Sequence, residues 1–193
     1  MRESANFVMN GMIEPRPRRI YFDANVYITA LESRSDAARA IFRLFGGWDW
    51  QQHLIVTSEF TLAEVPVHPI ASALRSGDYE LHDSYQSIVA DEPGVREVIP
   101  ASRSVLVRTA LVRAQMHRLS NCKIKTPDAI HVASALEAEC GTFVTGDVDL
   151  LAAVKDLCNR VGLENPERQP SLRHAFGVSQ HELDQLAEVL NCP

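Results

Sequence analysis

The chain has 193 residues, 46% of them hydrophobic, which suits a globular domain and argues against a disordered protein. Its formal net charge of −6 argues against a binder of naked nucleic acid, unless acids gathered at one site are matched by bound cations. No apolar run could cross a bilayer, the amino end lacks the build of a signal peptide, and the four cysteines form no C-x-x-C pair. We therefore expect a cytoplasmic protein with reduced thiols, no membrane segment and no zinc site.

The amino-terminal part of the chain predicts a lead-in, one strand and two helices. Residues 1–18 are polar and contain two prolines, which indicates a flexible lead-in. The apolar run Ile20–Phe22 follows and stops at Asp23, which predicts a buried strand ending on an acid. Apolar periodicity then predicts helices over residues 25–33 and 35–47.

The middle of the chain alternates strands with helices. The stretch HLIVTS, residues 53–58, predicts a strand, and the helix expected over 59–65 is soon interrupted by prolines. Further along, the pattern predicts a helix over 76–91, a strand over 94–99 and a long helix over 102–120. Strands separated by helices at this spacing indicate a parallel sheet with helices on both faces.

The last part of the chain contains the most clearly delimited helix. Thr126 as the cap, Pro127 in the first turn and Gly141 past the end predict a helix between them. The elements expected after it are a strand over 142–144, a helix beginning near 150, a short strand within 160–166 and a tail helix over 179–190.

Five carboxylates fall where the chain leaves a predicted strand or enters the next helix. They are Asp23, Glu64, Asp128, Asp147 and Asp149. Ligands of open parallel sheets bind at the carboxyl ends of the strands, so all five can face one edge. Each acid also has an ordinary structural explanation: Asp23 could be a turn residue and Glu64 an exposed helical residue. Asp128 could favour a helix dipole, and Asp149 could cap a helix.

Taken together, the acids need a countercharge, because several carboxylates within a few ångströms cannot all stay ionised without one. An arginine, backbone amides or a metal ion could supply it. No arginine lies in the segments that carry the acids. A hard divalent cation such as Mg²⁺ or Mn²⁺ fits the oxygen ligands, and it can activate a water and stabilise the oxygens of a phosphodiester.

Four stretches, in this order, resemble the PIN domain family, and most of all the ribonuclease toxins of VapBC-type toxin–antitoxin pairs. The stretches are IYFDANVYITALE, VTSEFTLAEV, TPDAIHVASALEAECGTFVTGDVDLL and GLENP. The resemblance implies a three-layer α/β/α sandwich with a central, mainly parallel sheet and a nuclease domain over residues 19–166. It also implies an endoribonuclease with one or two Mg²⁺ or Mn²⁺ ions, acting on RNA, forming a homodimer and restrained by an antitoxin protein. Residues 167–193 lie beyond the resemblance and are expected to form a partly helical extension.

The motifs of the family carry over to named positions of this chain. Asp23, Glu64, Asp128 and Asp147 match the acidic catalytic quartet, and Asp149 matches an additional acid. The implied metal ligands are Asp23, Asp128, Asp147 and Asp149, with Glu64 a ligand or a base that holds the attacking water. Asn25 and Thr145 match polar positions that orient metal ligands or water.

Two residues depart from the family pattern. Ala24 stands where serine or threonine is common. Pro66 follows the Glu64-Val65 pair, where proline removes a helical hydrogen bond and can bend the chain just past Glu64. The second departure puts the direction of the Glu64 side chain in question.

Three further residues near the acids have two interpretations each. His131, one turn after Asp128, is either a proton-transfer group or a histidine packed along a half-buried helix face, and the packing interpretation is favoured. Lys123 and Lys125 either contact RNA phosphate or are solvated loop lysines.

The alternatives for the whole protein are a catalytically silent domain that binds metal and a protein partner, or a nuclease specific for structured DNA.

Overall fold

The computed structural model describes residues 17–47, 52–90, 92–93, 95–120, 123–164 and 171–191. The predicted lead-in therefore lies outside the described residues, except for its last two positions. Within these ranges no helix has the length and apolar character needed to span a membrane.

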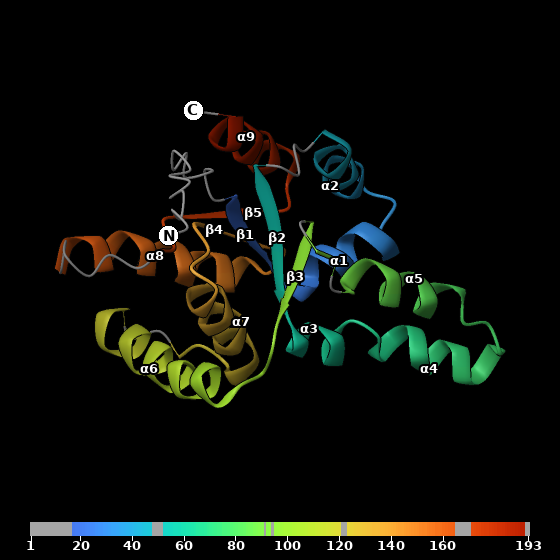
Figure 1. The fold of residues 1–193 in the computed structure, drawn as a ribbon, viewed down its shortest axis with the longest axis horizontal. Coiled ribbons are helices and arrows are strands. Elements are labelled where there is room, and N and C mark those ends of the chain that lie inside the picture. The colour runs from blue at the N-terminus through green and yellow to red at the C-terminus, as the bar shows by residue number, and fades with distance from the viewer. Residues whose placement is uncertain are drawn as a thin grey trace, which may run out of the picture.

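A parallel sheet forms the centre of the molecule, and five of its strands fall in the described ranges (Figure 1). They are β1 (Arg18–Phe22), β2 (His53–Ser58), β3 (Arg96–Ile99), β4 (Thr142–Thr145) and β5 (His174–Gly177), in the order β3-β2-β1-β4-β5. The chain builds outwards from β1 to β3 on one side and then from β4 to β5 on the other. The switch point of the sheet therefore lies between β1 and β4, where doubly wound folds bind their ligands.

Helices cover both faces of the sheet, which confirms the predicted three-layer arrangement (Figure 1). One face carries α6 (Arg103–Ser120), α7 (Thr126–Glu137) and α8 (Val148–Glu164). The other carries α1 (Ala24–Glu32), α2 (Asp36–Gly47), α5 (Glu80–Val89) and α9 (Gln180–Asn191). Two further helices, α3 (Glu59–Glu64) and α4 (Val67–Ser76), follow β2.

The period of two along each strand explains why the protein has two hydrophobic cores. Tyr21 and Phe143 point into the core beneath α6, α7 and α8. Ile20, Phe22 and Val144, their neighbours in the sequence, point into the core on the opposite face. Central strands covered on both faces must be apolar at successive positions, which is why these runs were recognisable in the sequence.

The structure contains a helix, α4, that the sequence interpretation did not predict. Pro66 is its N-cap and Pro69 lies in its first turn. Proline is tolerated in both places, because the first amides of a helix have no intrahelical acceptor. Gly77 follows α4 with a φ of 76°, a left-handed conformation that glycine adopts without strain.

The strand predicted within residues 160–166 is wrong, because α8 continues to Glu164. The strand at this side of the sheet is β5, which pairs with β4 and lies within residues 167–193. The predicted tail helix is confirmed as α9, and it packs against β5. The helix α7 begins one residue earlier than predicted, with Lys125 rather than Thr126 as its N-cap, and it ends at Glu137, a few residues before Gly141.

The carboxylate of Glu182 links α8, β5 and α9. It accepts hydrogen bonds from the Gly177 amide at 2.6 Å and from the Lys155 ammonium at 2.8 Å. Partial burial raises the pKa of Glu182, but these two donors outweigh it and hold the pKa below its usual value.

We expect Glu182→Gln to lower the free energy of unfolding at pH 7 by about 1 kcal/mol, because the charged acceptor of both hydrogen bonds is lost. The loss is no larger because Lys155 is half-exposed and solvent screens its charge. A depressed carboxyl pKa stabilises the fold above the unfolded pKa, and this stabilisation is lost as the pH falls through the folded pKa. Urea denaturation should therefore show a gap between the variant and the native chain that narrows below about pH 4. Glu188→Gln, on the exposed face of α9, is the matched control.

Candidate metal centre

The five acids leave the sheet at its carboxyl edge, close to the switch point. Asp23 directly follows β1, and Asp147 lies two residues past β4. Glu64 is the last residue of α3, which itself follows β2. Asp128 and Asp149 lie in the first turns of α7 and α8. The acids thus come from the ends of two strands and the ends of three helices, and Asp147 and Asp149 share the start of α8.

Asp23 is the most firmly held of these acids and is only 2% exposed. Its Oδ1 accepts a hydrogen bond from the Ala24 amide at 2.7 Å. Its Oδ2 accepts from the Thr145 hydroxyl at 2.6 Å and from the Asn25 side-chain amide at 3.3 Å. A buried carboxylate that accepts three hydrogen bonds has a fixed direction, so both of its oxygens are oriented in advance.

The hydroxyl of Thr145 also connects Asp23 with the start of α8. It accepts a hydrogen bond from the Asp147 amide at 3.0 Å, and the Asp147 carboxylate accepts from the Leu150 amide at 2.9 Å. Asp147 is therefore the residue that caps α8, and the structural explanation that gave this role to Asp149 is wrong. Asp149 is exposed in the first turn of the same helix.

The charges of Asp147 and Asp23 act on Asp128. Partial burial and the charge of Asp147 raise the pKa of Asp128, and the charge of Asp23 raises it further. The nearby Lys125 and His131 act in the opposite direction. Three carboxylates from β1, α7 and the β4–α8 turn thus share one electrostatic field, which is the arrangement that a cation would relieve.

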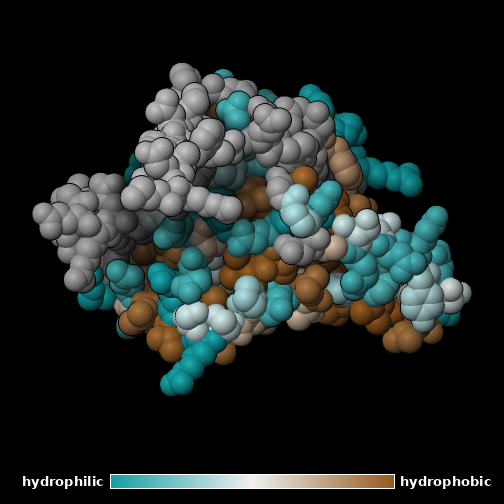
Figure 2. Space-filling model, in the orientation of Figure 1, coloured by the Kyte–Doolittle hydropathy of each residue, from teal (hydrophilic) through white to brown (hydrophobic). Residues whose placement is uncertain are grey.

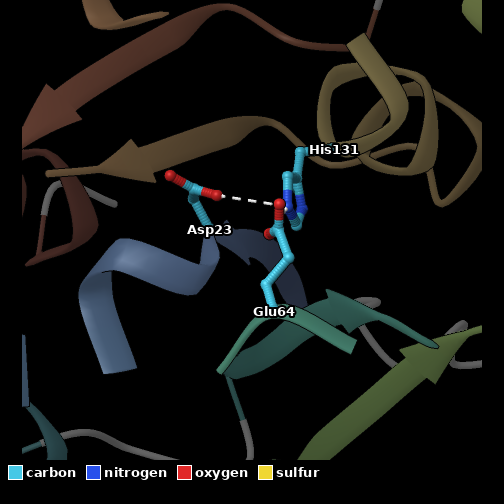
Figure 3. A group of neighbouring side chains, drawn as sticks. All are labelled: Asp23, Glu64 and His131. Atoms are coloured by element: carbon cyan, nitrogen blue, oxygen red, sulfur yellow. Dashed lines mark hydrogen bonds and ion pairs between the residues drawn. The ribbon is translucent and has the colours of Figure 1, made fainter. Parts of the chain in front are cut away.

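The imidazole of His131 faces the carboxylates of Asp23 and Glu64 (Figure 3). Its Nε2 is 2.7 Å from Glu64 Oε2 and 3.4 Å from Asp23 Oδ1. The ring is 1% exposed. The sequence interpretation favoured a packing role for this residue, but the structure directs the ring nitrogen at two carboxylates of the site.

Contacts on every side fix the imidazole of His131. Its Nδ1 is 2.8 Å from the Tyr21 hydroxyl, which is itself fully buried. The rings of Tyr21 and Phe60 approach it edge-on, with centroids 6.0 and 5.7 Å away. Burial lowers the pKa of His131, but the Glu64 hydrogen bond and the charges of Asp23 and Glu64 outweigh it and raise the pKa above its usual value.

Glu64 reaches the site despite the proline that follows it. The helix α3 ends at Glu64, and the chain turns through Val65 and Pro66 into α4. The Val65 amide still bonds to the Thr61 carbonyl at 3.0 Å, so the last turn of α3 stays intact. The bend therefore begins beyond Glu64, and its carboxylate faces His131.

The described residues contain one group whose donor atoms could hold a metal ion together. Asp23, Glu64 and His131 each offer an atom, and these atoms all lie within 4.8 Å of one another. Two carboxylate oxygens and an imidazole nitrogen are a donor set that divalent first-row metals accept. Asp128 and Asp147 are not part of this trio, and Asp128 is linked to Asp23 and Asp147 through their charges.

Lys123 and Lys125 lie just before the first turn of α7. Lys125 is the residue before the first helical turn, and its charge lowers the pKa of Asp128. Lys123 is two residues earlier, and both lysines are exposed.

Sequence reasoning underestimated His131 and did not consider Tyr21. The available signal was helical spacing: His131 is three residues after Asp128, so both side chains lie on the same side of α7. Tyr21 carried no such signal, because one tyrosine in a buried strand is most simply explained as core.

The fold is an α/β/α sandwich, and its acids gather near the switch point of the sheet. The chain is therefore an α/β/α protein with a candidate metal site at the carboxyl edge of its sheet. A sequence model of the PIN domain matches residues 20–157. The chain belongs to the PIN domain family. No curated protein matches the sequence.

Solved structures of three bacterial proteins share this fold. VapBC2 from Rickettsia felis, bound to a DNA fragment from its promoter, matches with a TM-score of 0.54 and 16% identity, covering 82% of this chain and 98% of that one. FitAcB from Neisseria gonorrhoeae matches at 0.51 and 17%, covering 69% and 91%. VapC20 from Mycobacterium tuberculosis, a sarcin–ricin loop cleaving toxin, matches at 0.50 and 15%, covering 69% and 94%. At these identities the likeness shows the fold.

Proposed function

We propose that this PIN domain is a divalent-metal-dependent endoribonuclease and the toxin of a toxin–antitoxin module. The observation that supports this proposal most is the convergence of four acids, Asp23, Glu64, Asp128 and Asp147, from four separate elements on one edge of the sheet. The ribonuclease activity is proposed by analogy with VapC20, a sarcin–ricin loop cleaving toxin of the same fold, and the antitoxin follows from the resemblance of the sequence motifs to VapBC-type toxins.

In this proposal, Asp23, Asp128 and Asp147 hold one or two Mg²⁺ or Mn²⁺ ions, with Asp149 as an additional ligand. When bound, the ion supplies positive charge for the phosphate oxygens and lowers the pKa of a bound water. Thr145 and Asn25 keep the Asp23 carboxylate in place through the hydrogen bonds described above.

Glu64 is the group suited to take a proton from the attacking water. Its carboxylate is about one-third exposed, so it can meet a water that comes from solvent, whereas Asp23 is buried. In hydrolysis the water oxygen would bond to phosphorus as its proton passes to Glu64, the bond from phosphorus to the ribose oxygen would break, and that oxygen would take a proton from solvent to leave as a hydroxyl. Lys123 and Lys125 would contact neighbouring RNA phosphates and offset the negative charge of the acids.

Exposed apolar side chains support a protein partner. They lie on α4 and the end of α3 (Leu62, Val67, Ile70, Leu74) and on α6 (Leu106, Val107, Leu111). Figure 2 shows apolar colour along the lower side of the molecule, where these helices run. The helices α1 and α2 contribute Tyr27 and Ile41 to the core, although α2 also exposes Phe42. We propose an antitoxin and a second copy of the chain as the partners of such surfaces.

A panel of nucleic acids tests the substrate class. The purified chain is given single-stranded RNA, structured RNA and branched DNA of the same sequence, each with Mg²⁺ or Mn²⁺. We expect cuts in RNA with either ion and none in DNA. Preferential cutting of branched DNA would instead favour the structure-specific DNA nuclease.

Two neighbouring acids of α8 should differ in importance. We expect Asp147→Asn to reduce RNA cleavage by at least about 100-fold, and Asp149→Asn to reduce it by less than about 10-fold. Asp147 is half-buried beside Asp128 and Thr145, whereas Asp149 is exposed. Single-turnover cleavage rates of both variants check this ranking, and equal losses would contradict it.

A second candidate function is a catalytically silent domain that binds metal and a protein partner. The exposed apolar residues of α4 and α6 favour it, because a partner-binding domain needs such surfaces whether or not it cleaves RNA. Stable metal binding without cleavage of any RNA would support this candidate.

A further inference from the structure

We propose that His131 is itself a ligand of the divalent ion, so that the site combines one nitrogen with its carboxylate oxygens and prefers Mn²⁺ to Mg²⁺. The inference rests on the proposed metal dependence and adds a residue and an ion preference to it. None of the family motifs described above assigns this histidine a place among the ligands.

Three distances carry the proposal. The His131 Nε2 is 2.7 Å from Glu64 Oε2 and 3.4 Å from Asp23 Oδ1, and the donor atoms of all three residues lie within 4.8 Å. Neighbouring ligands of an ion at about 2.1 Å from each are roughly 3 Å apart. The two nitrogen–oxygen distances bracket that separation, so an ion could be accommodated by small side-chain movements.

The orientation of the ring agrees with a ligand better than with a packed core histidine. A core histidine needs one partner for each ring nitrogen, but here the Nε2 faces two carboxylates, the partly exposed Glu64 and the buried Asp23. Metal-bound histidines typically donate their other ring N–H to a polar neighbour, which fixes the tautomer. Here the Nδ1 faces the Tyr21 hydroxyl at 2.8 Å and can keep its proton, so an ion bound by these residues would replace the proton that the Nε2 shares with Glu64.

A mixed donor set changes which ion binds best. Mg²⁺ prefers oxygen ligands, keeps several waters and gains little from an imidazole. Mn²⁺ also favours oxygen ligands, but as a first-row transition ion it accepts an imidazole nitrogen more readily than Mg²⁺ does. His131 should therefore contribute more to Mn²⁺ affinity than to Mg²⁺ affinity.

The test uses the full chain, freed of metal with a chelator and titrated with Mn²⁺. Electron paramagnetic resonance counts the bound Mn²⁺, and pulsed measurements detect a directly coordinated imidazole nitrogen. Mg²⁺ affinity is measured by competition. His131→Gln is compared with His117→Gln, which changes an exposed histidine of α6.

We expect a nitrogen signal in the native chain and in His117→Gln, and its loss in His131→Gln. The Mn²⁺ affinity of His131→Gln should fall by about tenfold or more, with a smaller change for Mg²⁺. Bound Mn²⁺ without nitrogen coupling in the native chain would overturn the proposal, and this measurement requires no variant to fold. Equal losses of Mn²⁺ and Mg²⁺ affinity in a folded His131→Gln would also overturn it.

RNA cleavage is measured separately on the same samples. A nitrogen signal in a chain that cleaves no RNA would support the ligand role of His131 and count against the nuclease function. Metal-dependent cleavage without the signal would count against His131 alone.

Discussion

Asp23→Asn should abolish RNA cleavage, with a fall in kcat/KM of about three orders of magnitude or more. Asp23 interacts with residues on both sides of the site. Its charge raises the pKa of Asp128, and its Oδ1 faces His131. A catalytic ion contributes several kcal/mol to the transition state, and each 1.4 kcal/mol corresponds to a factor of ten.

The Asp23→Asn protein should still fold. Asparagine has nearly the same volume and its oxygen can still accept from the Ala24 amide, while the Thr145 hydroxyl can serve as donor or acceptor. We expect a loss of stability of about 1–2 kcal/mol, because charged hydrogen bonds become neutral ones. Asp36→Asn, which changes an exposed acid of α2, is the control. A folded Asp23→Asn protein that cleaves within about tenfold of the native rate would remove Asp23 from the catalytic centre.

Asp128→Asn should also abolish cleavage, but with a small gain in stability rather than a loss. The ionised Asp128 lies in the field of Asp147 and Asp23 and is partly buried, and both effects raise its pKa. Asparagine removes this repulsion. Because solvent screens a partly exposed group, we expect a gain of about 0.5 kcal/mol at pH 7.

The pH dependence of this gain follows from the direction of the shift. A carboxyl whose folded pKa is raised binds its proton more tightly in the folded state, so the native chain loses stability as the pH rises from the unfolded pKa through the folded pKa. The advantage of Asp128→Asn should therefore be present at pH 7 and absent below about pH 3.8. Denaturation of both proteins across this range in metal-free buffer measures it. An advantage that grows on acidification would mean that repulsion does not govern Asp128.

The acids were predictable from the sequence because their positions are set by local structure. Asp23 and Asp147 follow buried strands, and Asp128 lies at the start of a helix. The ends of such strands and helices can be recognised from the pattern of apolar and capping residues in the sequence. The topological rule for parallel sheets then brings them to one edge without knowledge of any contact.

The role of His131 could not be predicted in the same way. Its partners, Tyr21 on β1 and Glu64 on α3, are 110 and 67 residues away in the chain. Whether a histidine on a buried helix face meets apolar side chains or carboxylates depends on which turn packs opposite it. Here the segment opposite His131 is the last turn of α3, and Pro66 follows it closely. Only the folded structure shows that Glu64 still faces His131 despite this proline.

The errors in the fold have a related cause. Gly162 and Pro69 are residues that usually interrupt helices, yet Gly162 lies inside α8 and Pro69 inside α4. A glycine costs a helix about 1 kcal/mol, which packing against a sheet can offset. The strand β5 is four residues long and gains its stability from pairing with β4, so its own sequence is a weak signal.

The most direct test of a metal-dependent ribonuclease is cleavage of a mixed pool of single-stranded and structured RNA by the metal-free chain. The reactions contain Mg²⁺, Mn²⁺ or chelator, beside Asp23→Asn, and metal binding is measured on the same preparations. We expect cuts that appear with either ion, disappear with chelator and are absent from the variant. Metal binding without cleavage under any condition would contradict the proposed activity.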